Sequence, residues 1–379
     1  MTFEFATAGR IVFGAGKVRE AGGIARDFGS RALVVTGRTA GRAAPLIRLL
    51  KEHGVEAVTF RVAGEPTLSL VQQATRAARD GQCELVVGIG GGSVIDTGKA
   101  VSALLTNGGD LLDYLEVIGG GKPLVKNSAP FIAIPTTAGT GAEATRNAVI
   151  ESPEHKVKVS LRSALMLPRV ALVDPELTYP LPREVTASAG LDALTQLIEV
   201  FVSVRANPMT DALCREGIPR VARSLRRAYE NGRDAAARED MALAALFSGI
   251  GLANAGLGAV HGFAAPVGGM FHAPHGAVCA ALLPHVMEAN RRALRARQPD
   301  GEALRRYEEI DRFFGGDAVA WITETCRMMK IPPLSAYGVT KTDFPALIEK
   351  AAASNSVKGN PVGLTEEELG NILEQCLSA

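Results

Sequence analysis

The sequence has little of several features that mark particular classes of protein. Its 41 lysine and arginine residues are balanced by 40 aspartate and glutamate residues, so it lacks the basic excess that binds nucleic acid. No apolar run approaches the roughly eighteen residues of a membrane-spanning helix, and the first residues lack the basic start and apolar run of a signal peptide. We therefore expect a soluble protein with neither a nucleic-acid partner nor a membrane partner.

Cysteine is also scarce. The five cysteines are odd in number, lie far apart and never stand in a paired-ligand spacing: Cys83, Cys214, Cys279, Cys326 and Cys376. Disulfide frameworks and cysteine-based metal sites both depend on such pairing. We therefore expect free thiols in a reducing compartment, with the cytoplasm as the location.

The first half of the chain alternates β-branched runs with amphipathic stretches. Strands are expected at residues 32–36, 57–60, 85–88 and 131–134, and helical spacing of apolar residues appears at 40–53 and 68–80. This alternation is typical of strand-helix-strand units around a parallel sheet, a fold class that binds nucleotides but supports many chemistries.

The amino-acid composition of the chain changes after Asp174. Pro175, Pro180 and Pro182 interrupt the chain, and the residues beyond them are rich in helix formers. A chain of 379 residues is also long for one core. We predict an α/β plus all-α protein with two domains: a dinucleotide-binding parallel-sheet domain at residues 1–180 and an all-helical metal and substrate domain at 181–379.

Two loops follow expected strands. In Gly88–Ser93, three successive glycines and a serine lead from a strand into a helix, where open backbone N–H groups and the helix N-terminus attract phosphate. The loop matches neither the G-x-G-x-x-G fingerprint nor a P-loop, and a tight turn is the alternative. Pro135–Glu143 places hydroxyls and glycines after the next strand, where α/β sheets bind ligands, and a plain surface loop is its alternative.

A metal site is indicated in the second half. Asp192 and Gln196 are four residues apart and share one face of a helix, and imidazoles follow at His261, His272 and His275. Carboxylate and imidazole ligands suit zinc, iron and other first-row divalent ions, whereas an amide oxygen is a weaker ligand.

Several motifs resemble, in order and spacing, those of the iron-dependent (group III) alcohol dehydrogenase family. They are Gly90–Lys99, Pro135–Gly141, Asp174–Leu177, Gly190–Leu194, Pro274–Gly276 and Leu283–Val286. Each motif alone is weak, but the resemblance extends from Phe13 to Pro361 and so covers essentially the whole chain.

The resemblance implies an NAD(P)-dependent alcohol dehydrogenase or aldehyde reductase. In this family a hydride passes between nicotinamide and a small alcohol or aldehyde in a cleft between the two domains. Carried onto this chain, the implied contacts with the cofactor are Gly91, Gly92, Ser93, Asp96, Thr136, Thr137 and Thr140. Lys158 would lie near the nicotinamide as a catalytic residue. The implied ligands of an iron or zinc ion are Asp192, Gln196, His261 and His275.

Two positions depart from the family pattern. The second ligand is usually a histidine but is Gln196 here, and the histidine that usually follows the third ligand by four residues is Ala265. We therefore expect loose metal binding. His272, three residues before His275, is the candidate for the catalytic polar group that Ala265 does not supply.

Two alternatives stay open. One is a metal-independent reductase of an activated or acidic carbonyl compound, similar to maleylacetate reductases, although the retained Asp192, His261 and His275 argue against it. The other is a weakly active homologue that serves as a binding protein, although a protein without hydride chemistry has no physical need for both cofactor loops.

Two further expectations concern the cofactor and the assembly. After the strand ending at Thr36, the family often has an aspartate that binds the adenosine ribose, but this chain has Gly37 and Arg38. A guanidinium favours a 2′-phosphate, so we expect NADP to be accepted alongside NAD. The strand-like segment Arg10–Phe13 would leave an exposed sheet edge, and the family resemblance also implies a homo-oligomer such as a dimer.

Overall fold

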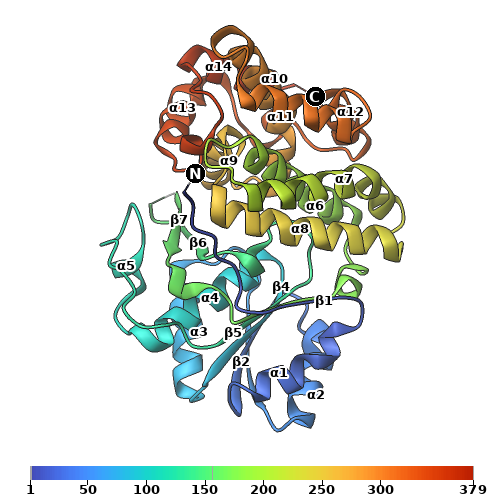
Figure 1. Cartoon of the computed structure of the whole chain (residues 1–379). Helices are drawn as coiled ribbons and strands as arrows, with labels where there is room; N and C mark the ends of the chain where they lie inside the picture. Colours follow the sequence, from blue (N-terminus) through green and yellow to red (C-terminus); the bar gives the residue numbers. More distant parts are fainter. Residues whose placement is uncertain (1, 156, 379) are drawn as a thin grey trace. The chain divides into compact units, whose positions relative to one another are not determined.

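The computed structural model describes residues 2–155 and 157–378, which fall into two compact units (Figure 1). The α/β unit comprises Ala6–Thr137 and Gly141–Tyr179. The helical unit comprises the chain from Pro180 onward, the segment Ala138–Thr140 and the N-terminal residues up to Phe5.

The α/β unit is built on a six-stranded sheet in the order β1-β8-β5-β4-β2-β3, in which every pair of neighbours is parallel. The strands are β1 (Ile11–Phe13), β2 (Arg31–Thr36), β3 (Glu56–Arg61), β4 (Leu85–Gly90), β5 (Phe131–Pro135) and β8 (Val170–Val173). From β2 the chain moves outward to β3 and then returns past β2 to β4. The strand order therefore reverses between β2 and β4.

Helices cover both faces of this sheet, because alternate strand residues point to opposite sides. Leu33, Val35 and Val86 pack in one apolar cluster with α3 (Leu68–Asp80) and α4 (Gly92–Asn107). Val34 and Val87 pack in another with α1 (Ala21–Arg26) and α2 (Ala44–Glu52). The result is a three-layer arrangement, and its buried strands read as nearly continuous apolar runs, as expected for a parallel sheet.

Two elements of this unit lie outside the parallel sheet. The antiparallel ribbon of β6 (Asn147–Ser152) and β7 (Val157–Arg162) packs beside α4, and α5 (Leu111–Tyr114) is a single turn capped by Asp110. Sequence reasoning did not predict the ribbon.

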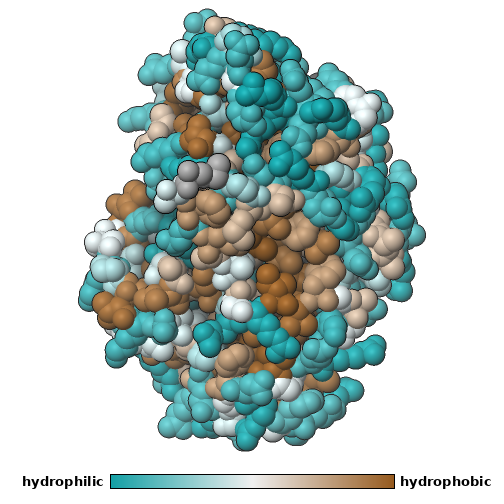
Figure 2. Space-filling model, viewed as in Figure 1, coloured by the Kyte–Doolittle hydropathy of each residue, from teal (hydrophilic) through white to brown (hydrophobic). Residues whose placement is uncertain are grey.

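The helical unit centres on α6 (Arg183–Val202), which packs against α7 (Pro208–Glu230), α8 (Ala235–Ala255) and α10 (His275–Arg297). Its other helices are α9 (Ala259–Phe271), α11 (Glu302–Phe313), α12 (Ala318–Met328), α13 (Phe344–Ala353) and α14 (Glu366–Gln375). On the face drawn in Figure 2, hydrophilic residues cover much of the surface of the C-terminal helices, while the apolar side chains form a core inside.

By length and composition α6 could cross a membrane, and α8 with α9 passes the same test across a bend of 100°. However, 83% of the most apolar window of α6 is buried within the protein. Helix α6 is therefore the core helix of this unit.

The fold class predicted from the sequence is confirmed: a parallel α/β domain precedes an all-helical domain. The N-terminal strand also forms, and it pairs with β8 at the sheet edge. The domain limits of 1–180 and 181–379 stay a prediction.

Candidate metal and cofactor sites

The core helix α6 carries three polar side chains along one face. Asp192, Gln196 and Glu199 follow one another at helical spacing, and they are 2%, 2% and 4% exposed. Burying polar groups costs free energy unless partners satisfy them, so such a face in an apolar core requires explanation.

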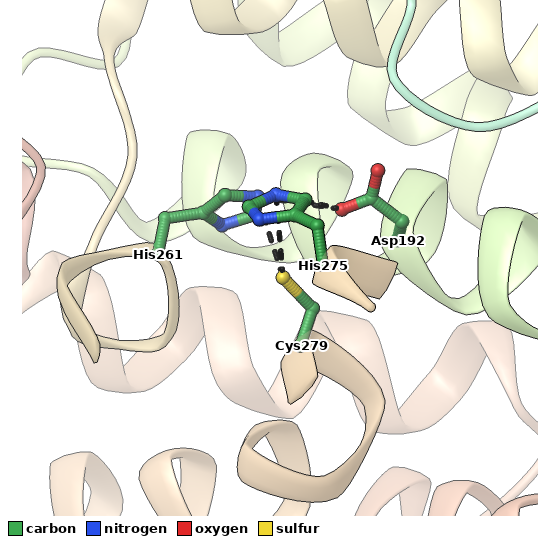
Figure 3. A group of neighbouring side chains, drawn as sticks. All are labelled: Asp192, His261, His275 and Cys279. Atoms are coloured by element: carbon green, nitrogen blue, oxygen red, sulfur yellow. Dashed lines mark hydrogen bonds and ion pairs between the residues drawn. The ribbon is translucent and has the colours of Figure 1, made fainter. Parts of the chain in front are cut away.

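Four side chains meet at this face (Figure 3). Asp192 of α6, His261 of α9, and His275 and Cys279 of α10 each offer one ligand atom, and these atoms lie within 4.8 Å of one another. Asp192 Oδ1 is 3.4 Å from His261 Nε2 and 3.7 Å from His275 Nε2. Cys279 Sγ is 3.7 Å from the Nε2 atom of each histidine. The group has the ligand types of a transition-metal site.

Asp192 Oδ1 is the atom whose environment is most informative. Within the described part of the chain this buried oxygen has no hydrogen-bond partner. Burial alone would raise the pKa of Asp192, but the neighbouring imidazoles of His261 and His275 outweigh burial and hold the pKa below its usual value. Burial likewise opposes a charged His261, yet Cys279 and Glu199 raise its pKa well above its usual value. The cluster therefore attracts positive charge.

Glu199 fixes the orientation of His261. Its Oε2 atom is 2.6 Å from His261 Nδ1, and its Oε1 atom accepts the Val260 backbone N–H at 2.7 Å. Because a carboxylate accepts hydrogen bonds only, Nδ1 carries the proton, and Nε2 faces the cluster as a free ligand nitrogen. Metal-ligating histidines commonly have such a carboxylate partner.

Gln196 contacts the cluster through its amide nitrogen. Nε2 is 3.4 Å from Asp192 Oδ2, and Oε1 is 2.9 Å from Ser248 Oγ on α8. A carboxylate can only accept, so the network places the N–H side of the amide toward Asp192. The amide oxygen of Gln196 therefore points toward Ser248.

Gly276 lets the start of α10 approach α6. A Cβ atom at this position would lie 2.4 Å from the backbone oxygen of Ser188 and 3.3 Å from Asp192 Cβ. Any larger residue would push α10 away from α6. The glycine thus sets the separation between His275 and Asp192.

Most of the predicted cofactor residues gather at one edge of the sheet. The loops Gly37–Arg38, Gly91–Ser93 and Thr136–Thr137 follow the adjacent strands β2, β4 and β5, whose register pairs Thr36 with Ile89. Parallel sheets bind ligands at the carboxyl ends of their strands where the strand order reverses. Here that reversal falls between β2 and β4.

The glycine loop also argues for a ligand. A Cβ atom at Gly90 would lie 2.5 Å from Val94 Cγ2, so packing requires that glycine. Gly91 has φ −79° and ψ −171°, an extended backbone open to any residue, and a Cβ atom there would meet only Thr137, at 3.4 Å. Neither packing nor dihedral angles demand a glycine at 91, and close approach of a ligand to the backbone remains as its physical reason.

Other predicted residues already have protein partners. Asp96 forms an ion pair with Lys99 at 2.9 Å and accepts a backbone N–H of β6. Lys158 on β7 forms an ion pair with Glu65 at 3.2 Å. Arg38 is exposed and donates from Nε and Nη2 to a backbone carbonyl of the segment after β3.

The roles of Thr140 and His272 stay predictions. Thr140 lies in Ala138–Thr140, a segment that groups with the helical unit. His272 is exposed and ends α9 with a left-handed φ of 50°, outside the four-residue cluster.

Sequence reasoning missed Cys279 and Glu199. Cys279 follows His275 by four residues and Glu199 follows Asp192 by seven, both spacings that place side chains on one helix face. Helical periodicity applied outward from the predicted ligands would have found both residues.

The fold and the cluster together define a two-domain protein with a nucleotide-binding type of sheet and a helical metal site. Residues 8–175 match the family "Iron-containing alcohol dehydrogenase", and residues 186–377 match "Fe-containing alcohol dehydrogenase family, C-terminal". The chain therefore belongs to the iron-containing alcohol dehydrogenase family, as its motifs predicted.

Individual relatives agree with this assignment. Alcohol dehydrogenase 4 of Saccharomyces cerevisiae (strain YJM789) is 36% identical over 360 residues, which cover 93% of this chain and 90% of that protein. The 1,3-propanediol dehydrogenase of Klebsiella pneumoniae is 36% identical over 359 residues, covering 92% and 91%. A solved structure of a 1,3-propanediol oxidoreductase has a TM-score of 0.91 at 34% identity and covers 99% of this chain and 100% of that one.

Proposed function

We propose that this protein transfers a hydride between NADP(H) or NAD(H) and a small alcohol or aldehyde, assisted by a divalent metal ion. The observation that carries the proposal is the buried Asp192 carboxylate with an unpartnered oxygen, facing two imidazoles, in a chain of this family. If this part of the core were only structural, apolar side chains would stabilise it more than a buried carboxylate whose oxygen has no hydrogen-bond partner.

The proposed cofactor site lies at the carboxyl edge of β2, β4 and β5. The backbone N–H groups of Gly92 and Ser93 begin the 16-residue helix α4, where the pyrophosphate gains hydrogen bonds and the helix dipole. Thr136 and Thr137 supply hydroxyls on the next strand, and Asp96, Thr140 and Lys158 complete the set that the family implies. Arg38 has N–H groups beyond the two that hold the backbone carbonyl, and these favour a 2′-phosphate.

The metal-binding part of the proposal rests on Asp192, His261 and His275, with iron or zinc as the ion. A bound ion of this kind supplies Lewis-acid polarisation of the substrate oxygen. Asp192 contributes the negative charge, Glu199 holds the proton on His261 Nδ1, and Gln196 donates to the second oxygen of Asp192. Because Ala265 carries no titratable group, His272 is the proposed residue for proton exchange.

The test is a cofactor-oxidation assay against a panel of aldehydes, with NADPH and with NADH, before and after metal removal. We expect activity that is lost with chelator, returns with zinc or iron, and disappears in Asp192→Ala and His275→Ala. Glu309→Gln on α11, outside the cluster, is the matched control. A kcat/KM strongly favouring NADH would refute the role of Arg38.

The assay also separates the second candidate, a metal-independent reductase of an acidic or activated carbonyl compound. The amide at Gln196 in place of an imidazole is the observation that favours this candidate. Activity toward such compounds that is indifferent to chelator and to His275→Ala would establish it in place of the metal-assisted reaction.

We further propose a cytoplasmic homodimer. The cysteines among the described residues are all free, which suits a reducing compartment. The short strand β1 lies at the sheet edge with Ile11 38% exposed, and an unpaired edge favours pairing with a second chain. Light scattering after size-exclusion chromatography should give about twice the chain mass of 39.7 kDa, and a single species at the chain mass would refute the dimer.

A further inference from the structure

We infer that Cys279 is a metal ligand that takes the place of the imidazole absent at Gln196, so that the site accepts a thiophilic divalent cation. Zinc, iron(II) and cobalt(II) are such ions, whereas magnesium, calcium and manganese(II) prefer oxygen ligands. The inference rests on the proposed metal-assisted function and specifies the ligands and the ion class of that site.

Four separations within the cluster fit a tetrahedral ion. Metal bonds of roughly 2.0–2.3 Å to oxygen, nitrogen and sulfur, at tetrahedral angles, hold the ligand atoms roughly 3.3–3.6 Å apart. The two separations from Asp192 Oδ1 to the imidazole nitrogens are 3.4 and 3.7 Å. The two separations from Cys279 Sγ to the same nitrogens are both 3.7 Å. The four ligand atoms, all within 4.8 Å of one another, are thus close enough to bind a single ion.

Cys279 differs from two other thiols of the helical unit. Cys326 and Cys376 each donate to a backbone carbonyl at 3.5 Å, an ordinary arrangement for a thiol in a core. Cys279 is fully buried, one helical turn after His275, and its sulfur contacts two imidazole nitrogens. The Asp192 oxygen that faces the same centre has no hydrogen-bond partner among the described residues, which independently indicates an ion there.

Gln196 is placed as an orienting residue and not as a ligand. Its amide nitrogen faces Asp192 and its oxygen lies 2.9 Å from Ser248 Oγ. To ligate a metal, Gln196 would have to turn its oxygen inward, lose the contact with Ser248 and oppose the lone pairs of Asp192. With Cys279 as ligand, the Asp192 carboxylate and the Cys279 thiolate together balance the two positive charges of the ion. This neutrality is favourable because an unbalanced charge is costly to bury.

Cobalt(II) is the probe that reports a sulfur ligand directly. In the first measurement, chelator-treated full-length protein is titrated with cobalt(II), and the near-ultraviolet sulfur-to-cobalt charge-transfer band is recorded. In the second measurement, zinc affinity is determined by competition with a chelating dye. Wild type and the control Cys326→Ser should bind one ion and show the band. Cys279→Ser should lose the band, and Cys279→Ala should lose at least about tenfold in zinc affinity.

The double variant Cys279→Ala with Gln196→His completes the test. An imidazole in place of the amide should restore zinc affinity while the band stays absent. A wild-type cobalt complex without the band overturns the inference, as does unchanged zinc affinity in Cys279→Ala. If both cysteine variants fail to fold by circular dichroism, the wild-type cobalt spectrum decides alone. A band in a protein that turns over no alcohol or aldehyde would support the ligand set and refute the proposed function.

Discussion

Glu199 allows the cluster to be perturbed without touching a proposed ligand. Its carboxylate accepts from His261 Nδ1 at 2.6 Å and from the Val260 backbone N–H at 2.7 Å, and its side chain is 5% exposed. In Glu199→Ala the imidazole loses the group that fixes its ring and its tautomer. We expect His261 Nε2 to face the cluster for only part of the time, so that metal affinity falls.

The size of the loss follows from the bonds removed. A hydrogen bond to a charged group contributes about 1.5–3 kcal/mol, which corresponds to roughly tenfold to a hundredfold in affinity. Glu199→Gln retains one accepting oxygen and should lie between wild type and Glu199→Ala. Zinc affinity is measured by competition with a chelating dye, and Glu309→Gln, whose carboxylate instead pairs with Arg215 on the surface, is the control.

One result would refute this reasoning. If Glu199→Ala binds zinc as tightly as wild type while His261→Ala does not bind it, then His261 is a ligand whose orientation does not depend on Glu199. Equal losses in the Glu309 control would instead reveal a general effect of carboxylate removal on the fold.

Three further predictions concern stability. Gly276→Ala should cost about 1–3 kcal/mol of unfolding free energy and weaken zinc binding, because its Cβ would lie 2.4 Å from a backbone oxygen; Gly370→Ala, in an open helical position, should not destabilise. Burial raises the pKa of the Glu143 carboxyl from 4.5 to about 7, so the free energy of unfolding falls as pH rises between these values. In urea titrations, Glu143→Gln should therefore raise the free energy of unfolding by about 3 kcal/mol above pH 7 and leave it unchanged below pH 4.5. Asp174→Ala leaves three backbone N–H groups without their acceptor and should cost about 3 kcal/mol, seen as a lower urea midpoint. Unchanged midpoints would contradict each prediction.

The sheet was predictable because its inner strands are buried on both faces. Ala32–Thr36 and Phe131–Ile134 are continuous apolar or β-branched runs, and the flanking glycines and prolines mark their ends. The strands β6 and β7 pair with each other in an antiparallel manner and lie outside the parallel sheet, so the expectation of strand-helix-strand units did not extend to them.

The metal cluster was only partly accessible to sequence reasoning. Asp192, His261 and His275 were grouped on residue chemistry and family resemblance, and they meet in space. Cys279 was set aside because cysteines were examined for pairs with other cysteines, whereas its neighbours in the cluster are imidazoles from two different helices. The orientation of the Gln196 amide depends on Ser248, a tertiary contact that no local pattern encodes.

The pairing of β1 with β8 has a consequence for how the chain is made. Asp174, directly after β8, accepts the backbone N–H of Gly16 across 158 positions of sequence. The N-terminal strand emerges first from the ribosome but has no partner until β8 has been synthesised, and contacts so distant in sequence form slowly. During synthesis, the edge of β5 that β8 later covers is open. The α/β unit should therefore acquire protease resistance only in nascent chains that extend beyond Asp174, and shorter chains should depend on chaperones.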